Sequence, residues 1–486
     1  MRYTSNERQR VERRLISKAT EDGYLLTPQA IDSLLEAADD PESLLSDLIN
    51  WLRSSGFKAP YIENGHVSDY LTRRAGTREV LETSNEATIE VLSPDYTDIW
   101  IEGDIEETTT YLIGRYYRLR RVIEERGLPI VSISEASRTS QREIYVVGSV
   151  TEKIDTKSGA LLVLEDPTSS IKAYVPASER RLQEPLEEVV PDVVVAVRLV
   201  KRDNTSVIKE IIYPDIANVS ERPKGPDVKV CVISDLHVGS KRFSEDAFQE
   251  FLDWLHSREA SRVKCLVING DLIDGVYVYP GQEKELALAS LSDQFREAGR
   301  LLKEVRDDIK IIYVPGNHEP VRKTIPQPPV QQRFREILDS SREVSYCGNP
   351  AKLRIGGNTM LFFHGQTFDD VIHSSTGYSY SNLVNDLNRL MTFFIRCRTL
   401  APTFGDSTPV LPTKVDHLFI DEVPSLFATG HVHVASMTTY KGVSLVNSGT
   451  WQEQTSYQRA VGLIPTVGTA AIYDLRTSTA YIRKFG

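Results

Sequence analysis

Residues 231–240 read CVISDLHVGS and place a short apolar run directly before two ligand-type side chains. The run from Val230 to Ile233 is apolar and largely β-branched, which predicts a buried strand. Asp235 and His237 follow it at once, at the strand end where open α/β sheets bind their ligands. Alone, the pattern also fits an Asx turn with a surface histidine, so its meaning depends on the rest of the chain.

Four further strand ends of this kind follow. Apolar runs end in GDL at 270–272, GNHE at 316–319, HG at 364–365 and GHVH at 430–433. Five of the nine histidines stand at such turns, namely His237, His318, His364, His431 and His433. A mixture of Asp, Asn and His suits divalent manganese, iron or zinc better than magnesium alone. The sequence therefore predicts a di-metal centre built from strand ends.

The series DLH, GDLID, GNHE, HG and GHVH resembles the calcineurin-like metallophosphoesterase superfamily. Three longer stretches, Gly316–Pro329, Leu361–Asp370 and Thr429–Thr455, resemble the small, exonuclease subunits of archaeal family D DNA polymerases. The close match covers roughly residues 105 to 486. The related B-subunits of eukaryotic replicative polymerases have lost the ligands, whereas this chain keeps them, so the resemblance implies an active enzyme.

The resemblance also implies a role for each ligand-type residue. One metal is held by Asp235, His237 and His433. The other is held by Asn317, His364 and His431, and the bridge between the metals is Asp271. His318 corresponds to the catalytic histidine of the family and not to a ligand. The implied cofactors are two divalent metal ions, manganese in the first place, with iron, zinc or magnesium as alternatives.

The implied function is that of a 3′–5′ exonuclease, a proofreading subunit of a replicative DNA polymerase. Two neighbouring cations can offset the charge that develops when a phosphodiester is attacked in line. The implied partners are a large catalytic polymerase subunit, in a heterodimer or larger assembly, and single-stranded or mismatched DNA 3′ ends. A sliding clamp is a further candidate. Two alternatives stay open, a non-catalytic scaffold subunit and a stand-alone phosphoesterase.

Bulk properties narrow the class of protein. A chain of 486 residues is too long for one compact core, so two or three domains are expected. There is no run of 18 apolar residues and no secretory signal, which predicts a cytoplasmic, nucleoid-associated protein without membrane contact. The net charge of -11 excludes a globally basic nucleic-acid coater but not local DNA contact. The four widely spaced cysteines are expected to be buried free thiols.

The sequence predicts an α+β protein of several domains. Residues 1–75 form a small helical unit, which serves either as a docking module or as a tethered domain without chemistry. Residues 76–140 provide a linker, over about 76–105, and a helix. Residues 141–220 carry five short β-branched runs typical of an OB-fold barrel. A short linker over 221–227 leads into residues 228–486, the predicted phosphoesterase domain.

The phosphoesterase domain is expected to have an αββα architecture with two packed sheets. Its first strands alternate with helices expected over 245–256 and about 283–305, as right-handed crossover connections require. After Ser345 the pattern turns to strands.

Several residues near these motifs have two interpretations. Asp274 fits a ligand-orienting acid and a turn or helix cap equally well. We expect Asp369 and Asp370 to stand at a helix N-terminus and Trp451 to be buried between sheets. The arginines of the helix over 111–126 are expected to lie on a solvated face.

Overall fold

The computed structural model describes residues 5–37, 40–54, 60–75, 79–82, 87–202, 205–219 and 222–486. The chain forms two compact units. The first comprises Met1–Thr77, Gly103–Gly114 and Pro412–Asp416, and the second comprises Arg78–Glu102, Arg115–Leu411 and His417–Gly486. Within the described ranges, no helix is both long and apolar enough to cross a membrane.

The first unit is a helical bundle. Its helices are α1 (Ser5–Glu21), α2 (Pro28–Ala37), α3 (Pro41–Ser54) and α4 (Asn64–Ala75). Proline opens both α2 and α3, where its fixed φ fits the first helical turn. The strands β1 (Leu25–Leu26) and β2 (Tyr61–Ile62) pair in parallel beside them. Apolar side chains spaced three and four residues apart, such as Leu34, Leu45 and Leu48, are fully buried and hold the helices together.

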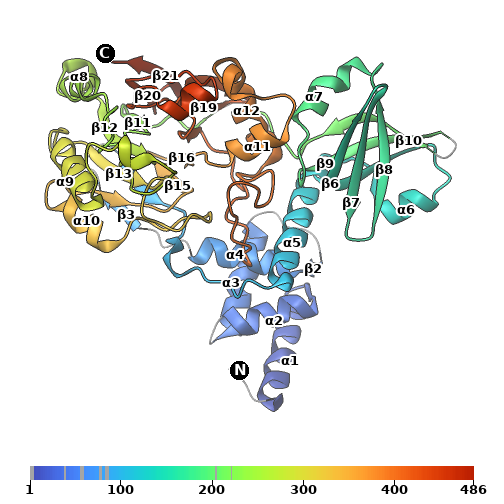
Figure 1. Ribbon diagram of the computed structural model, residues 1–486. Helices are drawn as coiled ribbons and strands as arrows, with labels where there is room; N and C mark the ends of the chain where they lie inside the picture. Colours follow the sequence, from blue (N-terminus) through green and yellow to red (C-terminus); the bar gives the residue numbers. More distant parts are fainter. Residues whose placement is uncertain are drawn as a thin grey trace. The chain divides into compact units, whose positions relative to one another are not determined.

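The second unit contains a five-stranded barrel. The strands are β6 (Glu143–Thr156), β7 (Gly159–Asp166), β8 (Ser169–Pro176), β9 (Val194–Arg202) and β10 (Thr205–Ile212). They pair in the order β6-β7-β8-β10-β9, and β6 pairs with β9 to close the barrel (Figure 1). Among the pairings of these five strands, that of β8 with β10 is parallel and the others are antiparallel. All five runs predicted as strands are therefore strands, and alternate residues such as Val146 and Leu162 fill the interior.

Two mixed sheets form the rest of the second unit. The first has the order β14-β13-β12-β11-β20-β21. Its strands are β11 (Lys229–Ile233), β12 (Val263–Asn269), β13 (Lys310–Val314), β14 (Ser345–Tyr346), β20 (Thr469–Asp474) and β21 (Thr479–Lys484). The second has the order β18-β19-β17-β16-β15-β4-β3. Its strands are β3 (Glu79–Glu82), β4 (Thr88–Val91), β15 (Ala351–Ile355), β16 (Asn358–Phe362), β17 (Leu426–Thr429), β18 (Ala435–Tyr440) and β19 (Val443–Ser448).

The two sheets face each other across an apolar layer. Val232 and Val267 from the first sheet belong to the same buried cluster as Phe362 and Val446 from the second. The outer face of the first sheet is covered by α8 (Glu245–Leu255), α9 (Leu291–Leu302) and α10 (Gln332–Asp339) (Figure 1). The helix α12 (Leu383–Cys397) packs on β18 and β19 of the second sheet. This layering aligns the ends of strands from both sheets, which is what positions the site.

Some expectations need correction. The helix expected over 283–305 spans only Leu291–Leu302, because the backbone of residues 285–288 is hydrogen-bonded to residues 239–241 instead. The helix α12 interrupts the region after Ser345 where strands were expected, whereas α11 (Phe368–Ser374) carries Asp369 and Asp370 in its first turn as expected. In α12 the buried residues include Leu383, Leu387 and Phe394, a helical spacing that the sequence interpretation overlooked.

The linker interpretation of residues 76–105 also fails in part. The strands β3 and β4 form a hairpin there, and β4 pairs with β15 at the edge of the second sheet. Ile89 of β4 is fully buried. The strand is only four residues long, which is too short for alternation of apolar and polar residues to identify it from the sequence. Residues 76–78, 83–86 and 221, which belong to the two expected linkers, lie outside the described residues.

Three expectations about burial have definite outcomes. Arg115, expected on a solvated face, is buried and donates hydrogen bonds to the Thr399 hydroxyl and to the carbonyls of Ala401 and Pro402. Trp451 is buried as expected, but it packs against Phe248 of α8 and not between the sheets. All four cysteines are buried and free, which confirms that prediction.

Candidate metal centre

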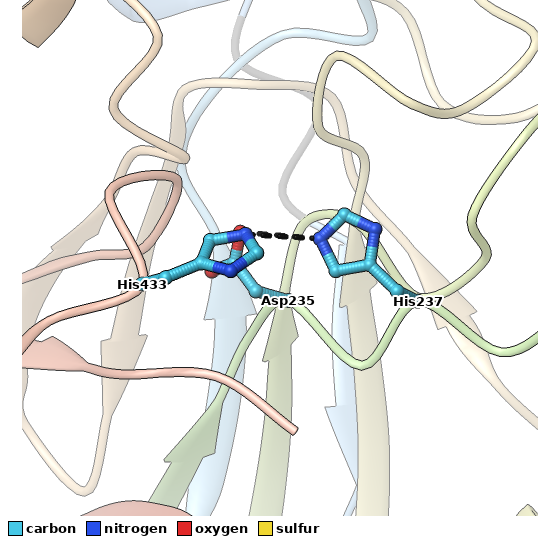
Figure 2. A group of neighbouring side chains, drawn as sticks. All are labelled: Asp235, His237 and His433. Carbon is cyan, nitrogen blue, oxygen red and sulfur yellow. Dashed lines mark hydrogen bonds and ion pairs between the residues drawn. The ribbon is translucent and has the colours of Figure 1, made fainter. Parts of the chain in front are cut away.

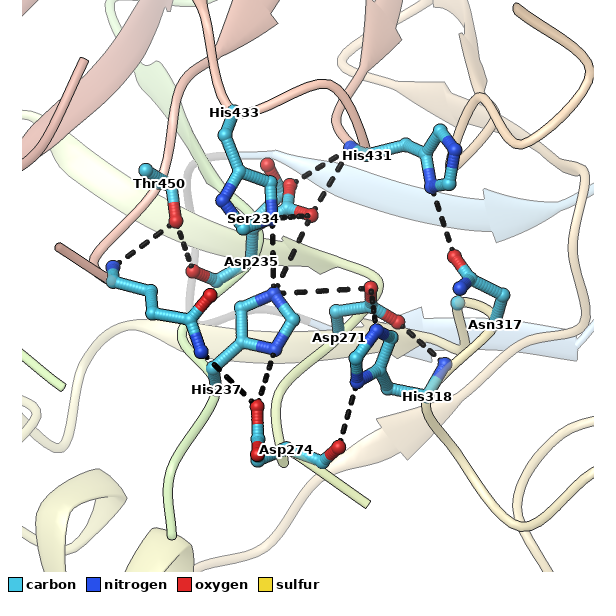
Figure 3. Close-up of polar contacts among 12 residues, drawn as sticks. Ser234, Asp235, His237, Asp271, Asp274, Asn317, His318, His431, His433 and Thr450 are labelled. Carbon is cyan, nitrogen blue, oxygen red and sulfur yellow. Dashed lines mark hydrogen bonds and ion pairs between the residues drawn. The ribbon is translucent and has the colours of Figure 1, made fainter. Parts of the chain in front are cut away.

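Five strand ends from the two sheets meet at one place. Asp235 and His237 follow β11, Asp271 follows β12, Asn317 and His318 follow β13, His364 follows β16, and His431 and His433 follow β17. The structure thus brings together all eight side chains predicted from the sequence (Figure 3 draws seven of them). Positive φ angles occur at five of these non-glycine residues, namely Asp235, His237, Asp271, His431 and His433. Such strained backbone is typical of functional sites.

The first group consists of Asp235, His237 and His433 (Figure 2). The Nε2 atoms of the two histidines are 3.0 Å apart, and Asp235 Oδ1 lies 3.3 Å from Nε2 of His433 and 3.9 Å from Nε2 of His237. All three side chains are almost completely buried. A carboxylate oxygen and two imidazole nitrogens, all of metal-ligand type, therefore converge beside a cavity that His237 and His433 line.

The outer nitrogen of each histidine in this group has a partner of its own. Nδ1 of His237 lies 3.0 Å from Asp274 Oδ1, and a proton on Nδ1 leaves the Nε2 lone pair free to bind a cation. The Gln458 Nε2 atom lies 2.8 Å from Nδ1 of His433, while the Oε1 atom of the same amide accepts from the Thr455 backbone. The Gln458 side chain therefore fixes the orientation of the His433 ring.

The second group surrounds the side-chain oxygen of Asn317. Oδ1 of Asn317 lies 3.0 Å from Nε2 of His364 and 2.9 Å from Nδ1 of His431. The opposite ring nitrogens donate elsewhere, His364 Nδ1 to the Asn269 carbonyl at 3.0 Å and His431 Nε2 to Asp369 Oδ2 at 2.9 Å. Burial would lower the pKa of His364, but the charge of Asp271 outweighs burial and raises that pKa to about 10. In the metal-free chain His364 therefore carries a second proton, which a bound cation would replace. One amide oxygen and two imidazole nitrogens thus form a donor set that fits a metal.

Asp271 stands between the two groups. Its Oδ2 atom lies 3.2 Å from Nε2 of His364 and 3.9 Å from Nε2 of His237. Burial alone would raise the pKa of this carboxyl, but the facing histidines outweigh burial and hold the pKa well below its usual range. An ionised carboxylate in contact with both groups is what a bridging ligand requires.

His318 differs from the other histidines of the site. Its Nδ1 atom lies 2.6 Å from the Asp274 carbonyl, and its Nε2 atom lies 3.9 Å from Asp271 Oδ2. It lines a cavity of about 560 Å³ together with His237, Asp271 and His433. Burial, opposed by the charge of Asp271, lowers the pKa of His318 to about 4. The free chain therefore presents a neutral imidazole to the cavity.

Three glycines let the ligand loops approach one another. A Cβ atom at Gly270 would lie 2.1 Å from Nδ1 of His364, one at Gly316 would lie 2.3 Å from Asp271 Oδ1, and one at Gly430 would lie 2.6 Å from Asp235 Oδ2. Any side chain at these positions would displace a ligand.

Three acidic residues support the ligands in ways that the sequence did not settle. Asp274, which had two interpretations, orients His237. Asp369 stands in the first turn of α11 as expected, but its carboxylate also contacts His431. Glu319 accepts hydrogen bonds from the backbone amides of Asp271, Leu272 and Gly316, and it thereby braces two ligand loops. Its place in GNHE, directly after two site residues, was the available signal for this role.

Two packed mixed sheets whose strand ends gather these Asp, Asn and His side chains define a member of the calcineurin-like metallophosphoesterase superfamily. The family of DNA polymerase alpha/epsilon B-subunits matches residues 230–438, and the DNA polymerase II small subunit of Methanothermobacter thermautotrophicus is 34% identical over 95% of this chain and 97% of its own length. The chain belongs to the family of DNA polymerase II small subunits, the small subunits of archaeal family D DNA polymerase.

Other comparisons agree with this membership or add little to it. The DNA polymerase II small subunit of Thermoplasma acidophilum is 33% identical over 97% of this chain and 92% of its own length. A solved archaeal phosphodiesterase is similar to 53% of this chain and 100% of its own, at 12% identity and a TM-score of 0.27. That likeness is too low to support an argument.

Proposed function

We propose that the chain is the 3′–5′ exonuclease subunit of a replicative DNA polymerase, with a proofreading role. The observation that carries the proposal is the convergence of seven metal-ligand-type side chains beside His318, in a family whose members are named as polymerase subunits. A subunit with a purely structural role would gain nothing from burying so many carboxylate, amide and imidazole groups together. Residues 228–486 would form the nuclease domain, residues 141–220 an OB-fold and residues 1–75 a helical domain.

Two divalent cations fit the donor set, with manganese preferred and iron, zinc or magnesium as alternatives. Asp235, His237 and His433 would hold one, and Asn317, His364 and His431 would hold the other. Asp271 would contact both. When bound, such a pair supplies Lewis acidity to a phosphodiester and lowers the pKa of water.

His318 would be the catalytic residue. It is neutral in the free chain, and an anionic phosphodiester placed beside it favours its protonated form. The hydrogen bond from Nδ1 to the Asp274 carbonyl aims Nε2 at the cavity. From there the protonated ring can donate a hydrogen bond to the phosphoryl group, or a proton to the leaving 3′ oxygen.

The partners follow from the names of the relatives. A protein called a small subunit pairs with a larger one, so we assign a large catalytic polymerase subunit as the partner of this chain. The substrate would be the 3′ end of single-stranded or mismatched DNA. The helical domain over residues 1–75 would dock a sliding clamp or another replication protein.

Replacement of His318 by Ala tests the proposal. The variant should lose hydrolysis of a 3′-labelled single-stranded oligonucleotide while still binding Mn²⁺, because His318 is not a ligand. His256, an exposed histidine outside the site, provides the matched control as His256→Ala. Full activity of the His318 variant would refute its catalytic role. A wild-type chain that hydrolyses no DNA would indicate a scaffold subunit, and a preference for a chromogenic phosphomonoester would indicate a stand-alone phosphoesterase.

A further inference from the structure

The cavity above the metal centre combines two kinds of surface. Its floor consists of charged and imidazole groups that include Asp271 and His318. Tyrosine and aliphatic side chains form much of the remaining wall, among them Tyr279, Tyr457 and Leu463. Tyr457 is 62% exposed, so its ring is accessible to a ligand that enters the cavity. The cavity therefore suits a ligand with an anionic end and a flat apolar end.

Tyr457 is held at a fixed distance from a predicted metal ligand. It lies in the short helix α13 (Ser456–Ala460), which starts with a capping box between Thr455 and Gln458. The same Gln458 amide contacts Nδ1 of His433 at 2.8 Å. One buried glutamine thus ties the helix that carries Tyr457 to the first group of ligands.

Tyr279 is held in a similar way on the other side of the cavity. The fully buried Gln282 accepts from the Val278 amide at 2.8 Å and donates to the Asp274 carbonyl at 2.8 Å. Asp274 in turn orients His237. Both tyrosines therefore stand on segments that a buried glutamine connects to the ligand shell.

Glu285 joins the two segments. It accepts from the Ser456 hydroxyl at 2.7 Å and from the Tyr279 hydroxyl at 3.4 Å. The hydroxyl of Tyr279 is thus directed at the protein. The aromatic face, and not the phenol oxygen, is the part of this side chain that suits a ligand.

We propose that Tyr279 and Tyr457 bind the 3′-terminal base of an unpaired DNA strand by stacking, with its phosphodiester over Asp271 and His318. This inference rests on the proposed exonuclease function. Aromatic stacking is tolerant of base identity, which a nuclease acting on any sequence needs. The cavity volume of about 560 Å³ lies in the range of single-ligand pockets, ~300–1,000 Å³, so a paired end must open before it enters. Opening is easiest at a mismatch, and the cavity thereby favours mismatched ends.

The test compares two single-stranded oligonucleotides that differ only in the last residue, an ordinary nucleotide or an abasic one. The 486-residue chain with Mn²⁺ should cleave the ordinary end with a kcat/KM about 5- to 150-fold higher, the range given by stacking on one aromatic side chain. Tyr457→Ala and Tyr279→Ala should lower kcat/KM for the ordinary end much more than for the abasic end, so that the ratio of the two values falls towards one. Tyr457→Phe and Tyr279→Phe should keep the preference, because stacking does not need the hydroxyl.

Tyr277 supplies the matched control. It belongs to the same loop as Tyr279 and is 87% exposed, but it lies outside the cavity lining. Tyr277→Ala should therefore behave as wild type. Equal cleavage of both oligonucleotides by the wild type, or an unchanged preference in both alanine variants, would overturn the stacking proposal while the nuclease activity stands. Failure of the nuclease proposal is distinct, because the wild-type chain would then cleave neither oligonucleotide.

Discussion

Asp274→Asn probes the support of the metal centre without touching a predicted ligand. Asp274 is 1% exposed, and its Oδ1 atom lies 3.0 Å from Nδ1 of His237 and 3.1 Å from Nε2 of Gln452. Its Oδ2 atom accepts from Nε2 of Gln282 at 3.2 Å. Both carboxylate oxygens face donors, so the NH₂ group of an asparagine must face a donor in either orientation. The substitution removes the charge that supports His237 and leaves one buried donor unpaired.

The expected loss of metal affinity in Asp274→Asn follows from these contacts. Loss of the outer partner of a histidine ligand costs about 10- to 100-fold in metal affinity, or ~1.4–2.7 kcal/mol. An asparagine that keeps its oxygen towards His237 preserves the tautomer and gives the lower value. One that turns its NH₂ group towards His237 disfavours the Nδ1 proton and gives the higher value. The backbone carbonyl that orients His318 is unchanged, so the rate at saturating metal should fall much less than the affinity.

Calorimetric titration with Mn²⁺ measures the affinity, and cleavage of a 3′-labelled oligonucleotide at rising Mn²⁺ measures the rate. Asp293→Asn is the matched control, because the Asp293 side chain is 52% exposed. The effect of Asp293→Asn on the free energy of Mn²⁺ binding should stay within about 0.5 kcal/mol. An Asp274→Asn chain that binds Mn²⁺ as tightly as the wild type would refute the claim that Asp274 orients a ligand.

Three more predictions concern the same unit of the chain. Gly270→Ala should lower the free energy of unfolding, measured in urea, by about 2–4 kcal/mol, because φ at Gly270 is 93° and the new Cβ atom would collide with His364. In the control Gly281→Ala, φ is 84° but no atom lies within 4 Å of the new Cβ, so the free energy of unfolding should fall by only about 1 kcal/mol. Glu188→Ala should lower the free energy of unfolding by about 2–4 kcal/mol in the same assay, since this buried carboxylate accepts a hydrogen bond from Arg396 at 2.7 Å. A smaller loss would mean that the ion pair contributes little to stability. Mn²⁺ at 100 times its Kd should raise the free energy of unfolding by about 2.7 kcal/mol, and a chelator should reverse this effect. A melting temperature that changes neither with Mn²⁺ nor with the chelator would argue against a metal site.

The local sequence was enough to predict which side chains the structure brings together. Each ligand motif pairs an apolar run with a glycine-flanked turn, as in VING before Asp271. Strand formation and the conformation of a turn depend on neighbouring residues, so both can be predicted from a short window. The buried strands β11, β12 and β13 and the barrel strands were predictable for the same reason.

Contacts between distant segments were harder to predict. The role of Asp369 depends on the packing of α11 beside the loop that carries His431. The burial of Arg115 depends on carbonyl groups almost three hundred residues later, and no property of its own helix indicates them. The two interpretations of Asp274 were indistinguishable until the position of the His237 ring was known.

The stretch CVISDLHVGS shows which features depend on local sequence and which depend on contacts between distant segments. Its sequence alone determined a buried strand with Asp235 and His237 at its end, because apolar alternation and turn residues act locally. Only the tertiary structure decided that these two side chains would meet His433, almost two hundred residues later, on a loop after β17 of the other sheet. The sheets pack through their apolar faces, and that packing, together with the pairing of β11 with β20, brings the strand ends together. Truncation before Gly430 would therefore remove two predicted ligands, His431 and His433, and the strand β20 that pairs with β11.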